Sequence, residues 1–327
     1  MVVRAALAAN LLLLTAAYAQ AQSELKIGPR STAVFATVAQ AKELLTHRDE
    51  FVERMSLFDR AARLKLARKV SEKEYLAFVG QNVLAWSDAE KKKVTSAIQA
   101  VQKKLLTLGL PLPARVLIIK TTGKEEGGAA YTRGNAIVLP QSQLAGPAPL
   151  LQKLFCHELF HVLSRSNADM REKCYAAIGF EKCDELRFPK SLVARKITNP
   201  DAPKNDHCIR IKLAGKQQWA IPILYSRSEN YDAERGGEFF DYLEFRLLLV
   251  SRKGEAVKPI YDGKQPKLVG MQDVTGFFEQ VGRNTSYIIH PEESLADNFA
   301  LLVMRRDGLP SPGVIEKLRG VLKKPAR

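Results

Sequence analysis

Residues 157–161 read HELFH, which is the spacing H-E-x-x-H inside an apolar stretch that predicts a helix over residues 150–165. Residues four apart on an α-helix project from one face, so the imidazoles of His157 and His161 can bind one zinc ion. Glu158 could accept a proton from a water bound to that ion. The pattern predicts hydrolysis by a metal-activated water, whereas the alternative is a pair of hydrogen-bonded core histidines.

A hydrolytic zinc site needs a third protein ligand, and residues 287–297 (YIIHPEESLAD) offer the candidates. Pro291 and the acidic residues after it are typical of the first turn of a helix. Glu293 and Asp297 are four apart, so they share a face of that helix. We expect Glu293 to bind the metal and Asp297 to accept a hydrogen bond from a ligand histidine. Glu292 is the alternative ligand, and both glutamates could instead be ordinary charges at a helix start.

A peptidase also needs a group that stabilises the oxyanion of the tetrahedral intermediate. His290 and Tyr287 lie beside the proposed ligand in sequence, so they are the first candidates for this catalytic role. Tyr225 and Tyr231 are alternatives from the long segment between the two motifs.

These two motifs together resemble the gluzincin metallopeptidases, of which thermolysin is the familiar member. The resemblance covers about residues 130–165 and 287–300. It implies a zincin-like core, a Zn²⁺ cofactor, a peptide or protein substrate, and the ligand and supporting roles given above to Glu293 and Asp297. Asn135 and Ala136 are similar to the Asn-Ala of the family's edge strand, which implies that they pair with the substrate backbone. The chain differs in having Glu292 where the family has asparagine and Ala296 where it has serine.

The hydrophobic periodicity predicts an α+β fold. Capping boxes at Ser71/Glu74 and Ser87/Glu90 mark helix starts in the N-terminal part. Helices are predicted over 33–45, 51–66, 71–84, 87–108, 150–165, 291–305 and 311–322, and strands over 115–120, 129–139, 208–213, 219–225 and 239–250. We therefore expect a helical N-terminal region at 22–112 and a zincin-like catalytic domain at 113–327, with a β-rich insertion at about 166–286.

Residues 1–21 have the layout of a secretory signal peptide, with Arg4, an apolar stretch and an A-x-A-like cleavage site at 17–19. This predicts a secreted or periplasmic protein without an integral membrane segment after cleavage. Export would expose the cysteines to an oxidising environment. Four cysteines allow three pairings. We favour Cys174–Cys183, which leaves Cys156–Cys208, and the alternative is four free buried thiols.

The 327 residues contain 50 Lys+Arg and 35 Asp+Glu, a net charge of +15. Such a charge favours polyanionic surroundings. It supports an alternative function, a catalytically silent zinc-containing protein that docks on anionic envelope polymers. No basic-aromatic module indicates a nucleic-acid partner. Residues 197–203 (ITNPDAP) are a dense turn signal, typical either of a surface loop or of the rim of a substrate cleft.

Overall fold

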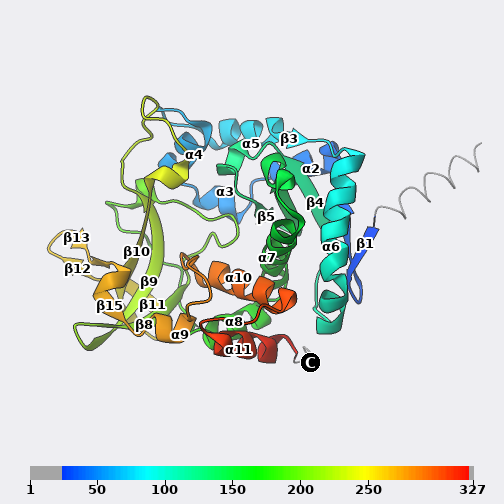
Figure 1. Cartoon of the computed structure of the whole chain (residues 1–327). Helices are drawn as coiled ribbons and strands as arrows, with labels where there is room; N and C mark the ends of the chain where they lie inside the picture. Colours follow the sequence, from blue (N-terminus) through cyan, green and yellow to red (C-terminus); the bar gives the residue numbers. More distant parts are fainter. Residues whose placement is uncertain (1–23, 324–327) are drawn as a thin grey trace, which may run out of the picture.

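A six-stranded mixed sheet carries the HELFH helix on one of its faces (Figure 1). The computed structural model describes residues 24–323, so the expected signal peptide at 1–21 lies outside the described residues. The strand order is β1-β2-β4-β6-β5, with β3 paired to β4. Parallel pairing joins β2 to β4 and β4 to β6, whereas β5 is an antiparallel edge strand. The strands are β1 (Glu24–Gly28), β2 (Ser31–Phe35), β3 (Val83–Leu84), β4 (Arg115–Thr121), β5 (Tyr131–Arg133) and β6 (Ala136–Pro140).

Alternating side chains of this sheet enter two different cores, because successive residues of a strand point to opposite faces. Ile118 and Ile137 pack into the core that contains α6 (Asp88–Leu108) and α7 (Ala148–Ser166). Ile119 and Val138 pack into the core on the other face. Four short helices cover that second face: α2 (Val38–Leu45), α3 (Glu50–Arg54), α4 (Leu57–Leu64) and α5 (Glu72–Gln81). Helices on both faces therefore hold the sheet, and α7 with it, in a fixed position.

A second sheet of seven strands forms most of the predicted insertion, in the order β11-β10-β9-β8-β15 with β14 on β10 and β7 on β8. It lies on the opposite side of the molecule from α6 (Figure 1). Its strands are β7 (Phe180–Lys182), β8 (His207–Leu213), β9 (Lys216–Ser226), β10 (Leu243–Lys253), β11 (Ala256–Pro259), β14 (Leu268–Val269) and β15 (Val274–Thr275). A separate hairpin joins β12 (Tyr261–Asp262) and β13 (Gln265–Pro266).

Helix α10 (Pro291–Met304) packs directly on α7, which brings the two sequence motifs together. The ring centroids of Phe160 on α7 and Phe299 on α10 are 5.6 Å apart in this interface. The remaining helices are α8 (Ala168–Ala177), α9 (Phe278–Val281) and α11 (Pro312–Leu322). Short 3₁₀ turns are η1 (Lys124–Glu126), η2 (Gln141–Ala145), η3 (Val193–Arg195), η4 (Phe239–Tyr242) and η5 (Met271–Asp273).

The structure confirms the α+β class and both capping boxes, in which the side chains of Ser71 and Ser87 accept from the backbone of Glu74 and Glu90. The predicted boundary at 112/113 is wrong. Strands β1 and β2 of the N-terminal region belong to the same sheet as β4, so residues 24–112 do not form a separate helical region. The predicted helix 33–45 is wrong at its start, because residues 31–35 pair with β4 and only residues 38–45 are helical.

The favoured cysteine pairing is also wrong. All four cysteines are buried free thiols, which was the alternative. Cys183 directly follows β7 and shares a small core with Cys208 of β8, and a hydrogen bond from the Cys183 thiol lowers the pKa of Cys208. Cys156 and Cys174 lie in the main core. Among the helices between residues 24 and 323, none combines the length and the apolar character needed to cross a bilayer.

Candidate metal centre

Helix α7 places the two histidines on one buried face, as their spacing predicts. The ring centroids of His157 and His161 are 4.8 Å apart and the rings are nearly perpendicular, at 81°. Glu293 on α10 lies against both rings: its Oε2 atom is 3.1 Å from Nε2 of His157 and 3.6 Å from Nε2 of His161. His161 and Glu293 are almost inaccessible to solvent. One nitrogen or oxygen atom from each of the three residues lies within 4.8 Å of the others, so the group could hold a metal ion.

Two buried atoms at this site lack the hydrogen-bond partners that buried polar atoms normally have. Among residues 24–323, Nε2 of His161 and Oε2 of Glu158 are buried without a partner. A nitrogen lone pair that faces a carboxylate and another imidazole is suited to a cation. The donor set of two imidazoles and one carboxylate fits a divalent transition metal such as zinc.

Each imidazole is oriented by a carboxylate at its other nitrogen. Nδ1 of His157 donates to Oδ1 of Asp297 over 3.1 Å, and Thr285 donates to the other oxygen of Asp297. Nδ1 of His161 donates to Oε1 of Glu292 over 3.0 Å. These bonds fix the tautomer in which both Nε2 atoms face Glu293. The structure thus brings Asp297 to the predicted supporting position and assigns Glu292 the same role for the second histidine.

Glu292 is held as a buried carboxylate by three donors. Besides His161, the hydroxyls of Ser164 and Tyr175 donate to its two oxygens. Burial opposes ionisation, but the hydrogen bond and the charge of His161 outweigh it and lower the pKa of Glu292. Both of its oxygens are therefore engaged away from Nε2 of His161, and it is Glu293 that faces both Nε2 atoms.

The electrostatics of the site favour a positive charge at the point that His157, His161 and Glu293 all face. Burial opposes protonation of His157, but hydrogen bonds with Asp297 and Glu293 raise its pKa to about 9. Burial and the nearby charge of Asp201 raise the pKa of Glu158 to about 8. A carboxyl group with a pKa near neutrality can both accept and return a proton at working pH, which is what a general base needs.

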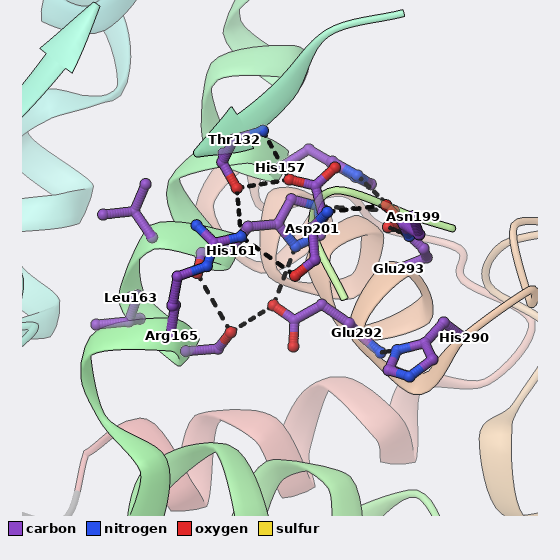
Figure 2. A network of polar contacts seen from close by, with 12 residues as sticks. Thr132, His157, His161, Leu163, Arg165, Asn199, Asp201, His290, Glu292 and Glu293 are labelled. Carbon is purple, nitrogen blue, oxygen red and sulfur yellow. Dashed lines mark hydrogen bonds and ion pairs between the residues drawn. The ribbon is translucent and has the colours of Figure 1, made fainter. Parts of the chain in front are cut away.

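Residues 199–201 complete the surroundings of the site, and the sequence left them as either a surface loop or the rim of a substrate cleft, without a contact to the metal ligands. Asn199 donates from Nδ2 to Oε1 of Glu293 over 2.5 Å. The carboxylate of Asp201 accepts from the backbone N–H of Thr132 over 2.7 Å and from its hydroxyl (Figure 2). Glu158, His161 and Asp201 each place one ligand-type atom within 4.8 Å of the others. The turn signal at 197–203 was visible in the sequence, but its place over the metal centre depends on the tertiary fold.

The candidates for the oxyanion-stabilising role occupy different places. The ring of Tyr287 stacks on His157 with centroids 6.1 Å apart, so it borders the metal centre. His290 caps α10 instead, because its Nδ1 accepts from the backbone N–H of Glu292. Burial and the charge of His207 lower the pKa of His290 to about 4, so its ring is neutral. His290 therefore serves the helix start rather than the group that faces the metal.

The other candidates lie elsewhere. The buried hydroxyl of Tyr231 donates to the carbonyl of Gly237, and the Tyr225 ring lies under the guanidinium of Arg195. Asn135 lies in the turn between β5 and β6, where its amide donates to the carbonyl of Arg115. Ala136 is buried and paired on both sides. The prediction of Asn135 and Ala136 as a substrate strand is wrong, because the sheet's free edge at this end is the outer side of β5.

No family model, curated protein or solved structure matches this chain. The functional argument therefore depends on the site itself.

Proposed function

We propose that this protein is an exported zinc metallopeptidase with a gluzincin-type site. The observation that carries the proposal is the unpartnered, buried Nε2 of His161, which faces Glu293 and His157 with Glu158 alongside. His157, His161 and Glu293 are the protein ligands, and Zn²⁺ is the cofactor. Three protein ligands leave a position for water and substrate, as hydrolytic zinc sites require.

The residues around the ligands have distinct roles in peptide hydrolysis. Zinc, when bound, supplies Lewis-acid chemistry at this point. Glu158 accepts a proton from the attacking water and passes it to the nitrogen of the departing amine. Asp297 and Glu292 hold the two imidazoles in the tautomer that presents Nε2. Tyr287, stacked on His157, is the residue best placed to donate a hydrogen bond to the oxyanion.

The proposal is tested by metal content and peptide hydrolysis in the same preparations. We expect the mature wild-type chain to bind about one equivalent of zinc and His157→Ala to bind none. Glu158→Gln should keep the zinc and lose hydrolysis of a peptide library, whereas the control Glu255→Gln, at an exposed position, should match the wild type. Zinc binding together with measurable turnover that is equal in Glu158→Gln and wild type would contradict the mechanism.

A second function has one observation in its favour, the cover that residues 199–201 form over the metal centre. A silent zinc-containing protein that docks on anionic envelope polymers would need no access to the metal. It predicts zinc binding without any hydrolysis that depends on Glu158, even after the covering residues are replaced.

A further inference from the structure

Residues 199–201 lie where an extended substrate would pair with the sheet. Strand β5 is the edge of the first sheet, and an added peptide would bind through the outward backbone groups of such an edge. The outward N–H of Thr132 on β5 already donates to the carboxylate of Asp201 over 2.7 Å. Arg165 on α7 fixes the same segment by donating to the carbonyls of Pro200 and Asp201.

The segment is anchored firmly just before it reaches the metal centre. The backbone N–H of Thr198 donates to the buried carboxylate of Asp59 over 3.0 Å, and its hydroxyl donates to the carbonyl of Arg54. Arg63 donates to the carbonyl of Thr198 over 3.2 Å. The backbone at Thr198 is therefore a fixed point, from which Asn199 and Asp201 extend over the ligands.

One oxygen of the Asp201 carboxylate accepts hydrogen bonds and the other is available to a metal ion. In the part of the chain that the structure describes, both donors from Thr132 bind its Oδ1, and no hydrogen bond joins its Oδ2. Asp201 forms a group with Glu158 and His161, and each of these two residues has a buried polar atom without a partner, Oε2 of Glu158 and Nε2 of His161. Figure 2 shows Asp201 amid the two histidines, Thr132 and Glu293. A carboxylate with a free oxygen that is grouped with a histidine whose Nε2 has no partner is the arrangement expected of two ligands of one ion.

Cavities flank the segment on its two sides. A cavity of about 450 Å³ is lined by Arg133, His207 and Glu292, and a smaller one by Tyr131, Phe239 and Tyr287. Pro200 and Asp201 border both cavities, so they form the partition between them. Moving this partition aside would join the cavities into one groove along β5, bordered by Glu292 at one end and Tyr287 at the other.

We propose that Asp201 is the fourth protein ligand of the metal, and that residues 199–201 hold the site closed in the place of a substrate. This inference rests on the proposed zinc site. Four protein ligands close a zinc site, whereas three leave the open position that hydrolysis needs. The protein is then latent in this conformation, and residues 199–201 must leave the metal and the edge of β5 before a peptide can bind.

The test uses cobalt(II) as a spectroscopic replacement for zinc and acetohydroxamate as a small probe of open metal positions. In the wild type, we expect the visible absorption of the cobalt-loaded protein to stay unchanged at millimolar acetohydroxamate. Asp201→Asn keeps the shape and the acceptor for Thr132 but removes the anionic ligand oxygen. Its cobalt spectrum should differ from that of the wild type and should respond to the probe. Its zinc affinity, measured by competition with a chelator, should fall about tenfold or more.

Asp262→Asn, on the exposed hairpin, is the matched control and should behave as wild type in both measurements. A wild-type cobalt spectrum that responds to acetohydroxamate as strongly as the variant's, with equal zinc affinities, would overturn this inference and leave the proposed zinc site standing. Failure of the wild type and of Asp201→Asn to bind either metal would overturn the site and this inference together. The wild-type spectrum requires no variant, so the test holds even if Asp201→Asn folds poorly.

Discussion

Glu292 and Glu293 are neighbours in sequence, yet their carboxylates contact opposite nitrogens of the His161 ring. Oε1 of Glu292 is 3.0 Å from Nδ1, and Oε2 of Glu293 is 3.6 Å from Nε2. Consecutive helical residues point about 100° apart, so one carboxylate reaches the back of the imidazole and the other reaches its metal-facing side. This relationship makes Glu293 the candidate ligand and Glu292 the candidate supporting residue, a choice that the sequence left open.

The first prediction concerns this pair. Glu293→Gln should lose tight zinc binding, because it removes an anionic ligand. Glu292→Gln should keep one equivalent of zinc with an affinity about tenfold lower, because its amide oxygen still accepts from His161 but no longer supplies charge. Competition with a chromophoric chelator measures both. If Glu292→Gln lost the metal and Glu293→Gln kept it, the two roles would be exchanged.

The second prediction concerns Arg63, a buried cation that donates to the carbonyl of Thr198, just before the covering residues 199–201. Arg63 is fully buried and pairs with Asp59 at 2.7 Å and with Glu126 at 2.9 Å. Arg63→Met leaves two carboxylates buried without their cation, so we expect a loss of about 3–5 kcal/mol in the free energy of unfolding. Urea denaturation measures the loss.

The control is Arg68→Met. Arg68 forms an exposed pair with Glu74, and such pairs contribute about 0–1 kcal/mol. Adding Glu126→Gln to Arg63→Met should restore part of the stability, because burial has already raised the pKa of Glu126 to about 7 and the neutral side chain suits its site. An equal loss of unfolding free energy in the Arg63 and Arg68 variants would show that the buried cluster stabilises the fold no more than an exposed ion pair does.

The third prediction concerns pH. Burial opposes the charge of Glu90, but hydrogen bonds from Lys120 and from Ser87 lower its pKa to about 2. A carboxyl group with a lowered folded-state pKa stabilises the fold above its unfolded pKa of about 4.5, and this contribution is lost as the pH falls towards 2. Between pH 5 and pH 3, the wild type should lose about 1 kcal/mol more stability than Glu90→Gln, after allowance for solvent screening.

Glu90→Gln is suited to this comparison because glutamine also completes the capping box with Ser87. The urea midpoint at each pH gives the difference. A difference in urea midpoint between wild type and variant that stays constant from pH 5 to pH 3 would contradict a lowered pKa for Glu90.

The fourth prediction concerns the thiols. The thiols of Cys183, just after β7, and Cys208, on β8, are joined by a hydrogen bond, whereas Cys156 and Cys174 are buried in the main core. Mild oxidation should therefore join Cys183 to Cys208, and peptide mapping by mass spectrometry should find that link. Residues 199–201 lie in the chain between them, so the bond would close a loop that contains the covering residues. A dominant Cys174–Cys183 or Cys156–Cys208 link would contradict the structure.

Local signals were sufficient for much of the secondary structure. The capping boxes at Ser71 and Ser87 and the apolar periodicity of 88–108 located two helices because these signals involve residues only a few positions apart. Strand β2 was missed, since its partner β4 lies some 80 residues later, and β1, which pairs with β2, was missed with it. Residues 129–139 were predicted as one strand, but a turn at Gly134 with a φ of 55° makes them a hairpin.

The sequence by itself predicted His157 and His161 as a metal-binding pair with Glu158 as its base, because the spacing of the two histidines fixes their common helical face. It also proposed Glu293 and Asp297 by the same spacing rule. Only the tertiary structure decided which of two adjacent glutamates faces the metal, and it placed Asn199 and Asp201 over the site. Those contacts join α7, α10 and a turn that are far apart in the chain, and their geometry depends on how the two helices pack rather than on any local pattern.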